Sequence, residues 1–183
     1  VDQKTFCITK KNSHVLTVCN CNGNWIRSVV LVNGNIMGLG AGNGYICVAL
    51  SDSIVYLWEK KSLKEPRKSI RSFIGQPSCI YMSEDLGIVI IGVSKMLEVI
   101  KIADMSVLRV IEMEIQPKKI FTTPSFGLIC VFGELIVNGT RKKALNVFTV
   151  NGKLLSKSVD VGRVVCGCGF EKDGIDLIAF ADN

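Results

Sequence analysis

One pattern returns four times along this chain: a glycine follows a polar turn and opens a short apolar segment. The four glycines are Gly44, Gly87, Gly127 and Gly174, and their separations are 43, 40 and 47 residues. A second apolar segment follows each of the first three, at 54–58, 97–102 and 145–150. Such a repeat limits the fold strongly, because each copy must form the same unit and bury its apolar surface against neighbouring copies.

The repeated segments have the composition of β-strands. The apolar runs are short and rich in Val and Ile, and the 183 residues include 17 glycines and only 4 prolines, which favours strands joined by turns. A period of about 40 to 45 residues with four short strands per unit is typical of a β-propeller, in which each sheet is sandwiched between its neighbours. We therefore predict an all-β fold, an incomplete β-propeller with three full blades and two partial ones.

The repeat divides the chain into five units. A partial blade is expected at 1–34, full blades at about 35–76, 77–117 and 118–162, and a second partial blade at 163–183. The innermost strands are expected near 36–39, 79–82, 119–122 and 165–170. The first residue is Val1 and not Met, so we expect a piece of a longer protein. Pairing of the two partial blades would instead close a ring of four blades.

The segment 48–58 resembles the end of a WD repeat, where a small residue, an Asp turn and an apolar strand lead to a closing tryptophan, here Trp58. The copy is degenerate. Glu59 replaces the usual Asp, and the only histidine, His14, lies elsewhere in the chain. The resemblance implies a WD-repeat-type propeller in which the buried Asp-His-Ser-Trp network of such blades cannot be complete.

A second resemblance lies at Val147-Phe148-Thr149-Val150-Asn151-Gly152-Lys153-Leu154, and 170–182 continues in the same style. These residues look like the carboxy-terminal propeller of BEACH-domain proteins, the beige and neurobeachin group. The resemblance implies a cytoplasmic protein-interaction scaffold for vesicle trafficking, lysosomes or autophagy, in peripheral contact with intracellular membranes. Its partners would be other proteins. The alternative is a generic WD-repeat adaptor in signalling or ubiquitin ligation.

Nothing in the sequence forms an enzyme motif. Nucleophilic or acid–base catalysis usually needs a histidine, a tuned carboxylate or a lysine beside the reacting group. The one histidine is near the amino end, and acidic residues such as those at 84–85 and 171–173 fall in expected turns, where solvation explains them. A propeller hydrolase with acidic groups along its channel is disfavoured, because the expected inner strands carry few ionisable residues. We predict a chain that is not an enzyme and has no cofactor.

Cysteines and glycines form two groups that could suggest ligand sites. The 8 cysteines lie in apolar strand patterns and are expected to be reduced core residues. The Cys-x-Cys pairs at 19–21 and 166–168 could offer thiolates to zinc, but their spacing and their separate strands argue against a metal. The glycines at 38–42 suggest a dinucleotide fingerprint, yet a strand follows where a helix is required, so we expect a tight turn. Asn138-Gly139-Thr140 is formally a glycosylation sequon.

Two basic clusters account for much of the net charge of +6. The first consists of Lys60, Lys61, Lys64, Arg67, Lys68 and Arg71, and the second of Arg141, Lys142 and Lys143. Both are expected at blade edges, where they could contact anionic lipid headgroups or acidic peptides, or remain solvated. Nucleic acid is not an expected partner, because no aromatic residues are interleaved with the basic ones. No apolar run reaches the roughly 20 residues that a membrane-spanning helix needs.

Overall fold

The computed structural model describes residues 5–9, 13–20, 22, 24–31, 34–42, 44–61, 66, 68–72, 75–161 and 164–182. These residues form seventeen β-strands and no helix, and every strand pair is antiparallel. The prediction of an all-β fold is therefore confirmed. In this part of the chain no helix exists that could cross a lipid bilayer.

The strands form five sheets, and within each sheet their spatial order follows the sequence. The first sheet contains β1 (Thr5–Ile8), β2 (Val15–Asn20) and β3 (Trp25–Val30). The second contains β4 (Ile36–Ala41), β5 (Tyr45–Leu50), β6 (Ile54–Glu59) and β7 (Lys68–Arg71). The third contains β8 (Cys79–Ser83), β9 (Ile88–Val93), β10 (Met96–Lys101) and β11 (Val107–Glu112).

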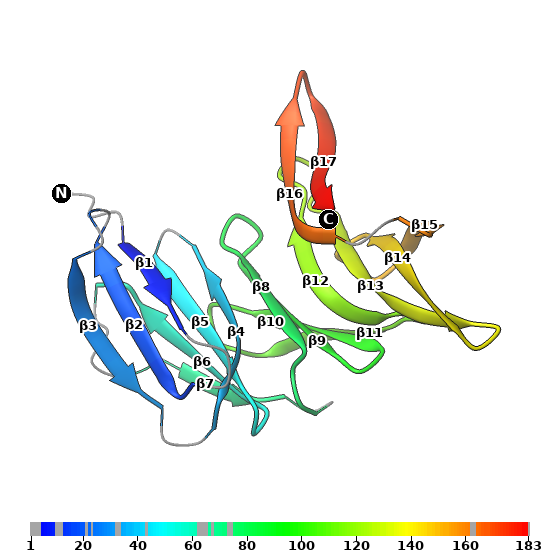
Figure 1. Ribbon diagram of the computed structural model, residues 1–183. Helices are drawn as coiled ribbons and strands as arrows, with labels where there is room; N and C mark the ends of the chain where they lie inside the picture. The colour runs from blue at the N-terminus through cyan, green and yellow to red at the C-terminus, as the bar shows by residue number, and fades with distance from the viewer. Residues whose placement is uncertain are drawn as a thin grey trace.

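The fourth sheet contains β12 (Gln116–Thr122), β13 (Ile129–Val137), β14 (Thr140–Phe148) and β15 (Leu154–Val159). The fifth is a hairpin of β16 (Val164–Lys172) and β17 (Ile175–Asp182). β12 begins before residue 118, where a unit was expected to start, because Gln116 pairs with Glu134 beyond a bulge at Lys118. The fifth sheet packs beside β12, and its hairpin projects upward at the top of Figure 1.

The sheets follow one another in a row, and the first strands of the second, third, fourth and fifth sheets lie side by side. We call β4, β8, β12 and β16 the inner strands. Their spacing explains why glycines lie in β4 itself. A Cβ atom on Gly38 would lie 2.6 Å from Ile80 Cγ2, and one on Gly40 would lie 3.2 Å from Met82. The expectation that the glycines at 38–42 form a turn is wrong for Gly38 and Gly40, which lie in β4 and permit close approach of β8, and is confirmed for Gly42, which follows β4.

Residues of each strand alternate between two packed faces. We call the face toward the next sheet the forward face and the face toward the preceding sheet the back face. In β9, Ile88 and Ile90 pack on the fourth sheet, whereas Val89 and Ile91 pack on the second. In β13, Cys130 belongs to the forward face and lies in one cluster with residues of the fifth sheet. Both faces of the inner sheets are therefore buried, which explains their continuous apolar strands.

Four of the five cysteines whose side chains the structure describes lie in the core. Cys19, Cys47, Cys79 and Cys130 are buried, and Cys168 is exposed. Burial raises the pKa of the Cys79 thiol to about 11 and that of Cys130 to about 12. Buried thiols of this kind behave as small apolar core residues. Trp58 is buried as well, and its Nε1 atom has no hydrogen-bond partner within the described part of the chain.

Candidate functional site: the extended β13–β14 hairpin

The hairpin of β13 and β14 is longer than its counterpart in the third sheet. Its strands have nine residues each, against six in β9 and β10. The turn is Asn138-Gly139, and both residues have positive φ values, 50° and 74°. Such a two-residue turn matches the twist of the strands, and pairing continues to Val137 and Thr140 at the tip. Residues 134–143 therefore form an ordered projection, which we call the hairpin extension.

The extension presents an apolar side chain next to a cation. Ile136 is 72% exposed and lies directly opposite Arg141 on the neighbouring strand, so the two side chains share a face. Leu135 points to the other face and packs against the core between the third and fourth sheets. Ile136 is consequently available to a partner, while Leu135 fixes the base of the extension.

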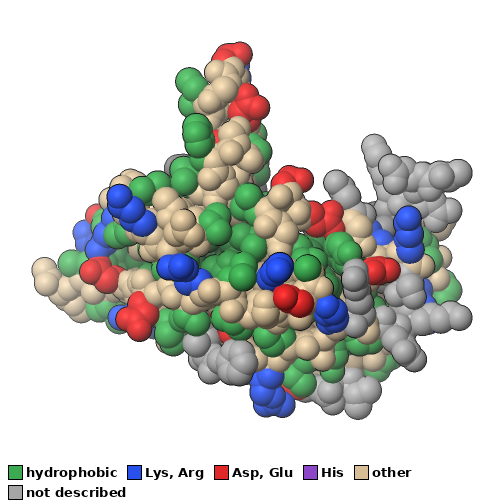
Figure 2. Space-filling view, turned by 180° about the vertical axis from the view of Figure 1, so that it is seen from behind, with side chains coloured by type: hydrophobic (Ala, Val, Ile, Leu, Met, Phe, Trp, Pro, Cys, Tyr) green, Lys and Arg blue, Asp and Glu red, His purple; other side chains and the backbone are tan. Residues whose placement is uncertain are grey.

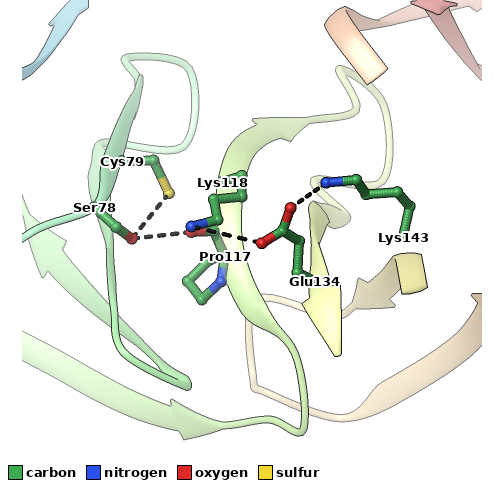
Figure 3. Close-up of polar contacts among 6 residues, drawn as sticks. All are labelled: Ser78, Cys79, Pro117, Lys118, Glu134 and Lys143. Carbon is green, nitrogen blue, oxygen red and sulfur yellow. Dashed lines mark hydrogen bonds and ion pairs between the residues drawn. The ribbon is translucent and has the colours of Figure 1, made fainter. Parts of the chain in front are cut away.

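Two of the three cations in the second basic cluster are paired with carboxylates. Lys143 donates to Glu134, which also lies 3.9 Å from Lys118 Nζ, so that a row of charges crosses three strands (Figure 3). The hydrogen bond from Lys143 is the main reason why the pKa of Glu134 lies below its usual range. Lys142 Nζ lies 2.7 Å from Asp160 Oδ2. Arg141 has no carboxylate within ion-pair distance in the described residues, although its charge also lowers the pKa of Glu134.

A cavity of about 190 Å³ lies at the base of the extension. Its walls come from Ser94 and Lys95 in the β9–β10 turn, from Gln116 at the start of β12, and from the extension itself. Ile136 and Arg141 both line it. The site therefore combines an apolar wall with the charges of Lys95 and Arg141 at its rim.

The first basic cluster lies elsewhere. Lys64 and Arg67 are outside the described residues. Lys60 and Lys61 follow β6, and Lys68 and Arg71 are the first and last residues of β7. Lys68 Nζ donates to the Ala103 carbonyl of the third sheet. Lys60 lies beside the beginning of β5, because its backbone N–H donates to the Gly44 carbonyl at 2.8 Å. Arg141 lies beside the end of β13, where it pairs with Ile136. The structure therefore separates Lys60 from the second cluster, whereas Arg71 pairs with Ile54 and lies beside the β5–β6 turn, at the end of its sheet that corresponds to the position of Arg141.

Two acidic residues, one in the β8–β9 turn and one in β17, have partners that the sequence did not reveal. Glu84 Oε1 accepts hydrogen bonds from the backbone N–H groups of Gly44 and Tyr45, both at 2.8 Å. Asp176 accepts from the N–H groups of Ser125 and Phe126, at 3.0 and 2.8 Å. Explaining Glu84 by solvation alone was wrong, because its carboxylate bonds a turn of the preceding sheet.

The described residues contain no group of three or more His, Cys, Asp or Glu side chains that could hold a metal ion. Cys19 lies in the first sheet and Cys168 in the fifth. Cys21 and the side chain of Cys166 lie outside what the structure describes. The two Cys-x-Cys pairs therefore gain no support as one site.

Comparison with known proteins gives a likeness of fold. No family model matches the chain, and no curated protein matches it. Among solved structures, a chain of hydrazine synthase from Kuenenia stuttgartiensis superimposes with a TM-score of 0.72 over 86% of this chain, at 17% sequence identity. This chain spans 46% of the length of that one. At such identity the likeness establishes shared architecture alone. In all, 894 chains of solved structures match this chain.

The comparison corrects one step of the sequence analysis. We predicted that the chain is not an enzyme, because its sequence forms no enzyme motif and its expected inner strands carry few ionisable residues. That prediction is contradicted, because the matched structure belongs to an enzyme. The fold itself therefore does not separate binding proteins from catalysts.

Proposed function

We propose that this chain is a segment of a β-propeller that binds other proteins. Three four-stranded sheets follow one another in sequence order, and each buries a forward and a back face. This arrangement supports the propeller proposal, as does the likeness to hydrazine synthase. Membership of a BEACH-type trafficking scaffold is a further proposal that rests on the resemblance at 147–154. Sequencing the parent transcript upstream of Val1 tests that part, since a BEACH domain should be encoded there.

The observation that carries the binding proposal is the hairpin extension. Ile136 is largely exposed at the side of a fixed hairpin. A partner that covers it makes the free energy of binding more favourable by about 25 cal/mol for each Å² of apolar surface removed from water. The type of turn and the strand pairing hold Ile136 in place, so little ordering entropy is lost on binding. The cavity beside it gives a partner side chain a place to enter.

The charges at the site favour an acidic partner. Lys95 and Arg141 line the cavity together with Glu134, whose carboxylate also lies 3.9 Å from Lys118 Nζ. A peptide with an aliphatic residue beside glutamate or aspartate would fill the cavity and contact Arg141. An anionic membrane fits less well, because Glu134 and Asp160 neutralise Lys143 and Lys142 and would lie against the headgroups. Figure 2 shows acidic and basic side chains interspersed at this end of the molecule, on the left.

Fluorescence polarisation with a labelled peptide of alternating glutamate and leucine tests the proposal, with a lysine and leucine peptide as the negative control. Arg141→Ser and Ile136→Ser should each weaken binding about tenfold, which corresponds to ~1.4 kcal/mol. Lys153→Ser, a change at an exposed cation in another turn, is the matched control and should leave affinity unchanged. Added salt should weaken binding of the native chain more than that of the Arg141 variant.

Two results would contradict this site. Equal affinity of the native chain and both hairpin variants for the acidic peptide would show that binding occurs elsewhere. Binding to phosphatidylserine vesicles without binding to the peptide would assign the basic residues to a membrane. Circular dichroism on each variant checks that the exposed substitutions leave the sheets folded.

A further inference from the structure

A cavity of about 240 Å³ lies between the third and fourth sheets, which we call the inner cavity. Its walls come from the end of β8, the β8–β9 turn, the end of β12 and the residues that follow it, with Gly42 and Gly169 at the sides. The third and fourth sheets each have a packed neighbour on both sides, so the cavity does not depend on where the chain begins or ends. Its volume is several times the roughly 30 Å³ of one water molecule, so a partner side chain fits.

The inner cavity has a negative wall. Glu84 and Asp85 line it, and the described residues around it include no lysine or arginine. Two backbone N–H groups hold Glu84 in place, and Asp85 is exposed to solvent. Carboxylates in a concave wall attract a cation more strongly than those on a flat surface, because the wall focuses their field. The charge of the cavity therefore favours a cationic ligand.

Two hydroxyl groups of the same wall are buried without a partner. Ser83 and Thr122 line the inner cavity, and each is only 7% exposed. Neither side chain forms a hydrogen bond with another described residue. Buried polar groups usually have a hydrogen-bond partner, and these two hydroxyl oxygens are free to accept one from a ligand. The ligand that fits is therefore both a cation and a hydrogen-bond donor.

An exposed aromatic side chain borders the inner cavity. Phe126 is 69% exposed in the loop between β12 and β13, whose residues Thr123 and Pro124 line the cavity. The loop is fixed on two sides. The Thr123 N–H donates to the Leu128 carbonyl at 3.0 Å, and Asp176 accepts from the Phe126 N–H at 2.8 Å. A partner that covers Phe126 therefore loses little free energy in ordering the loop.

The exposure of Phe126 is not caused by a missing neighbour. Leu86 and Phe126 each precede the repeated glycine of their sheets, and Leu86 packs into the core between the third and fourth sheets. A Cβ atom on Gly127 of the fourth sheet would lie 2.9 Å from Leu86 Cδ2. A Cβ atom on Gly174, the corresponding glycine of the fifth sheet, would have no described atom within 4 Å. The fifth sheet is thus in place beside this loop and still leaves Phe126 in solvent.

We propose that the inner cavity binds an arginine side chain from a basic segment of a partner protein, and that neighbouring residues of this segment cover Phe126. The guanidinium group has a positive charge and five N–H donors in a planar fork, which suits the carboxylate and hydroxyl oxygens of the wall. Its flat face also stacks on aromatic rings, and Tyr81 lines the cavity. Lysine has no planar fork and should bind more weakly. The site lies at the opposite end of the fourth sheet from the hairpin extension and is separate from it.

Fluorescence polarisation with a labelled peptide of alternating arginine and leucine tests the proposal, with the lysine and leucine peptide again as the negative control. The net charge of +6 repels both peptides from the chain as a whole, so affinity for arginine must come from a local site. Asp85→Ala and Phe126→Ser should each weaken binding about tenfold. The matched controls are Glu112→Ala, at an exposed carboxylate, and Leu108→Ser, at an exposed apolar residue. Both lie on β11 and should leave affinity unchanged.

Three results would overturn the proposal. Equal affinity of the native chain and both cavity variants would place the arginine elsewhere. Equal affinity for the arginine and lysine peptides would reduce the interaction to charge alone. Loss of binding in Ile136→Ser would assign the arginine peptide to the hairpin extension, whereas unchanged binding in that variant shows that the two sites act separately. Asp85→Asn keeps the size of the side chain and should weaken binding as much as Asp85→Ala, and circular dichroism checks that each variant is folded.

Discussion

Replacing Glu84 by alanine should loosen the contact between the second and third sheets. The carboxylate accepts two backbone hydrogen bonds from the β4–β5 turn, at 2.8 Å each. A hydrogen bond to a charged acceptor contributes about 1.5 to 3 kcal/mol when it is sheltered, and less when water can replace it. Gly44 is exposed and Tyr45 is half-buried. We therefore expect Glu84→Ala to lower the free energy of unfolding by about 2 kcal/mol in total.

Urea unfolding, followed by tryptophan fluorescence, measures this loss. Trp58 is buried in the second sheet and reports on the side that loses its bonds. With a denaturant dependence of about 2 kcal/mol per molar urea, the midpoint should fall by about 1 M. Glu84→Gln keeps an oxygen acceptor and should lose about half as much. Asp85→Ala, at the exposed neighbouring residue, is the control. A Glu84→Ala midpoint equal to that of Asp85→Ala would refute the conclusion that this carboxylate joins the sheets.

Three further predictions concern the β13–β14 turn, the carboxylate of Asp176 and the reactivity of the cysteine thiols. Gly139→Ala should destabilise the chain by about 1 kcal/mol in the same urea titration, because φ at this position is 74°, and no change would contradict the turn. Burial raises the pKa of Asp176, but hydrogen bonds from Thr123 and two backbone N–H groups outweigh this effect and hold the pKa below its ordinary value. The ionised carboxylate therefore stabilises the folded state at pH values above the pKa that Asp176 has in the unfolded chain, and this contribution is lost as the pH falls through the lower pKa of the folded state. The difference in the free energy of unfolding between the native chain and Asp176→Asn should accordingly shrink in acid. A thiol reagent should modify exposed Cys168 in the native chain and buried Cys79 only on unfolding, and mass spectrometry of digests distinguishes the two.

The features that the sequence predicted are those that depend on neighbours along the chain. Short apolar runs rich in Val and Ile, together with the repeated glycines, were sufficient to predict an all-β chain. Asn138-Gly139 was also a local signal for a two-residue hairpin turn, although we considered it only as a sequon. A closer look at the apolar and charged residues on either side of that pair would have predicted the hairpin extension.

The features that the sequence did not predict arise between sheets. Gly38 meets Ile80, and Glu84 reaches back 40 residues to Gly44, so neither contact has a local pattern. The second basic cluster was visible in the sequence, but strand pairing decides that Glu134 lies beside Lys143. Charge counting therefore overstated the free positive charge at this site.

The glycines of the inner strands have a geometric consequence for the whole assembly. Sheets that meet most closely at one edge diverge toward the other, so each is inclined to the next like a wedge. The contact of Gly38 with Ile80 sets how near those edges come, and a side chain at residue 38 would push them apart. A single missing Cβ atom thus helps to set the angle at which the second and third sheets meet.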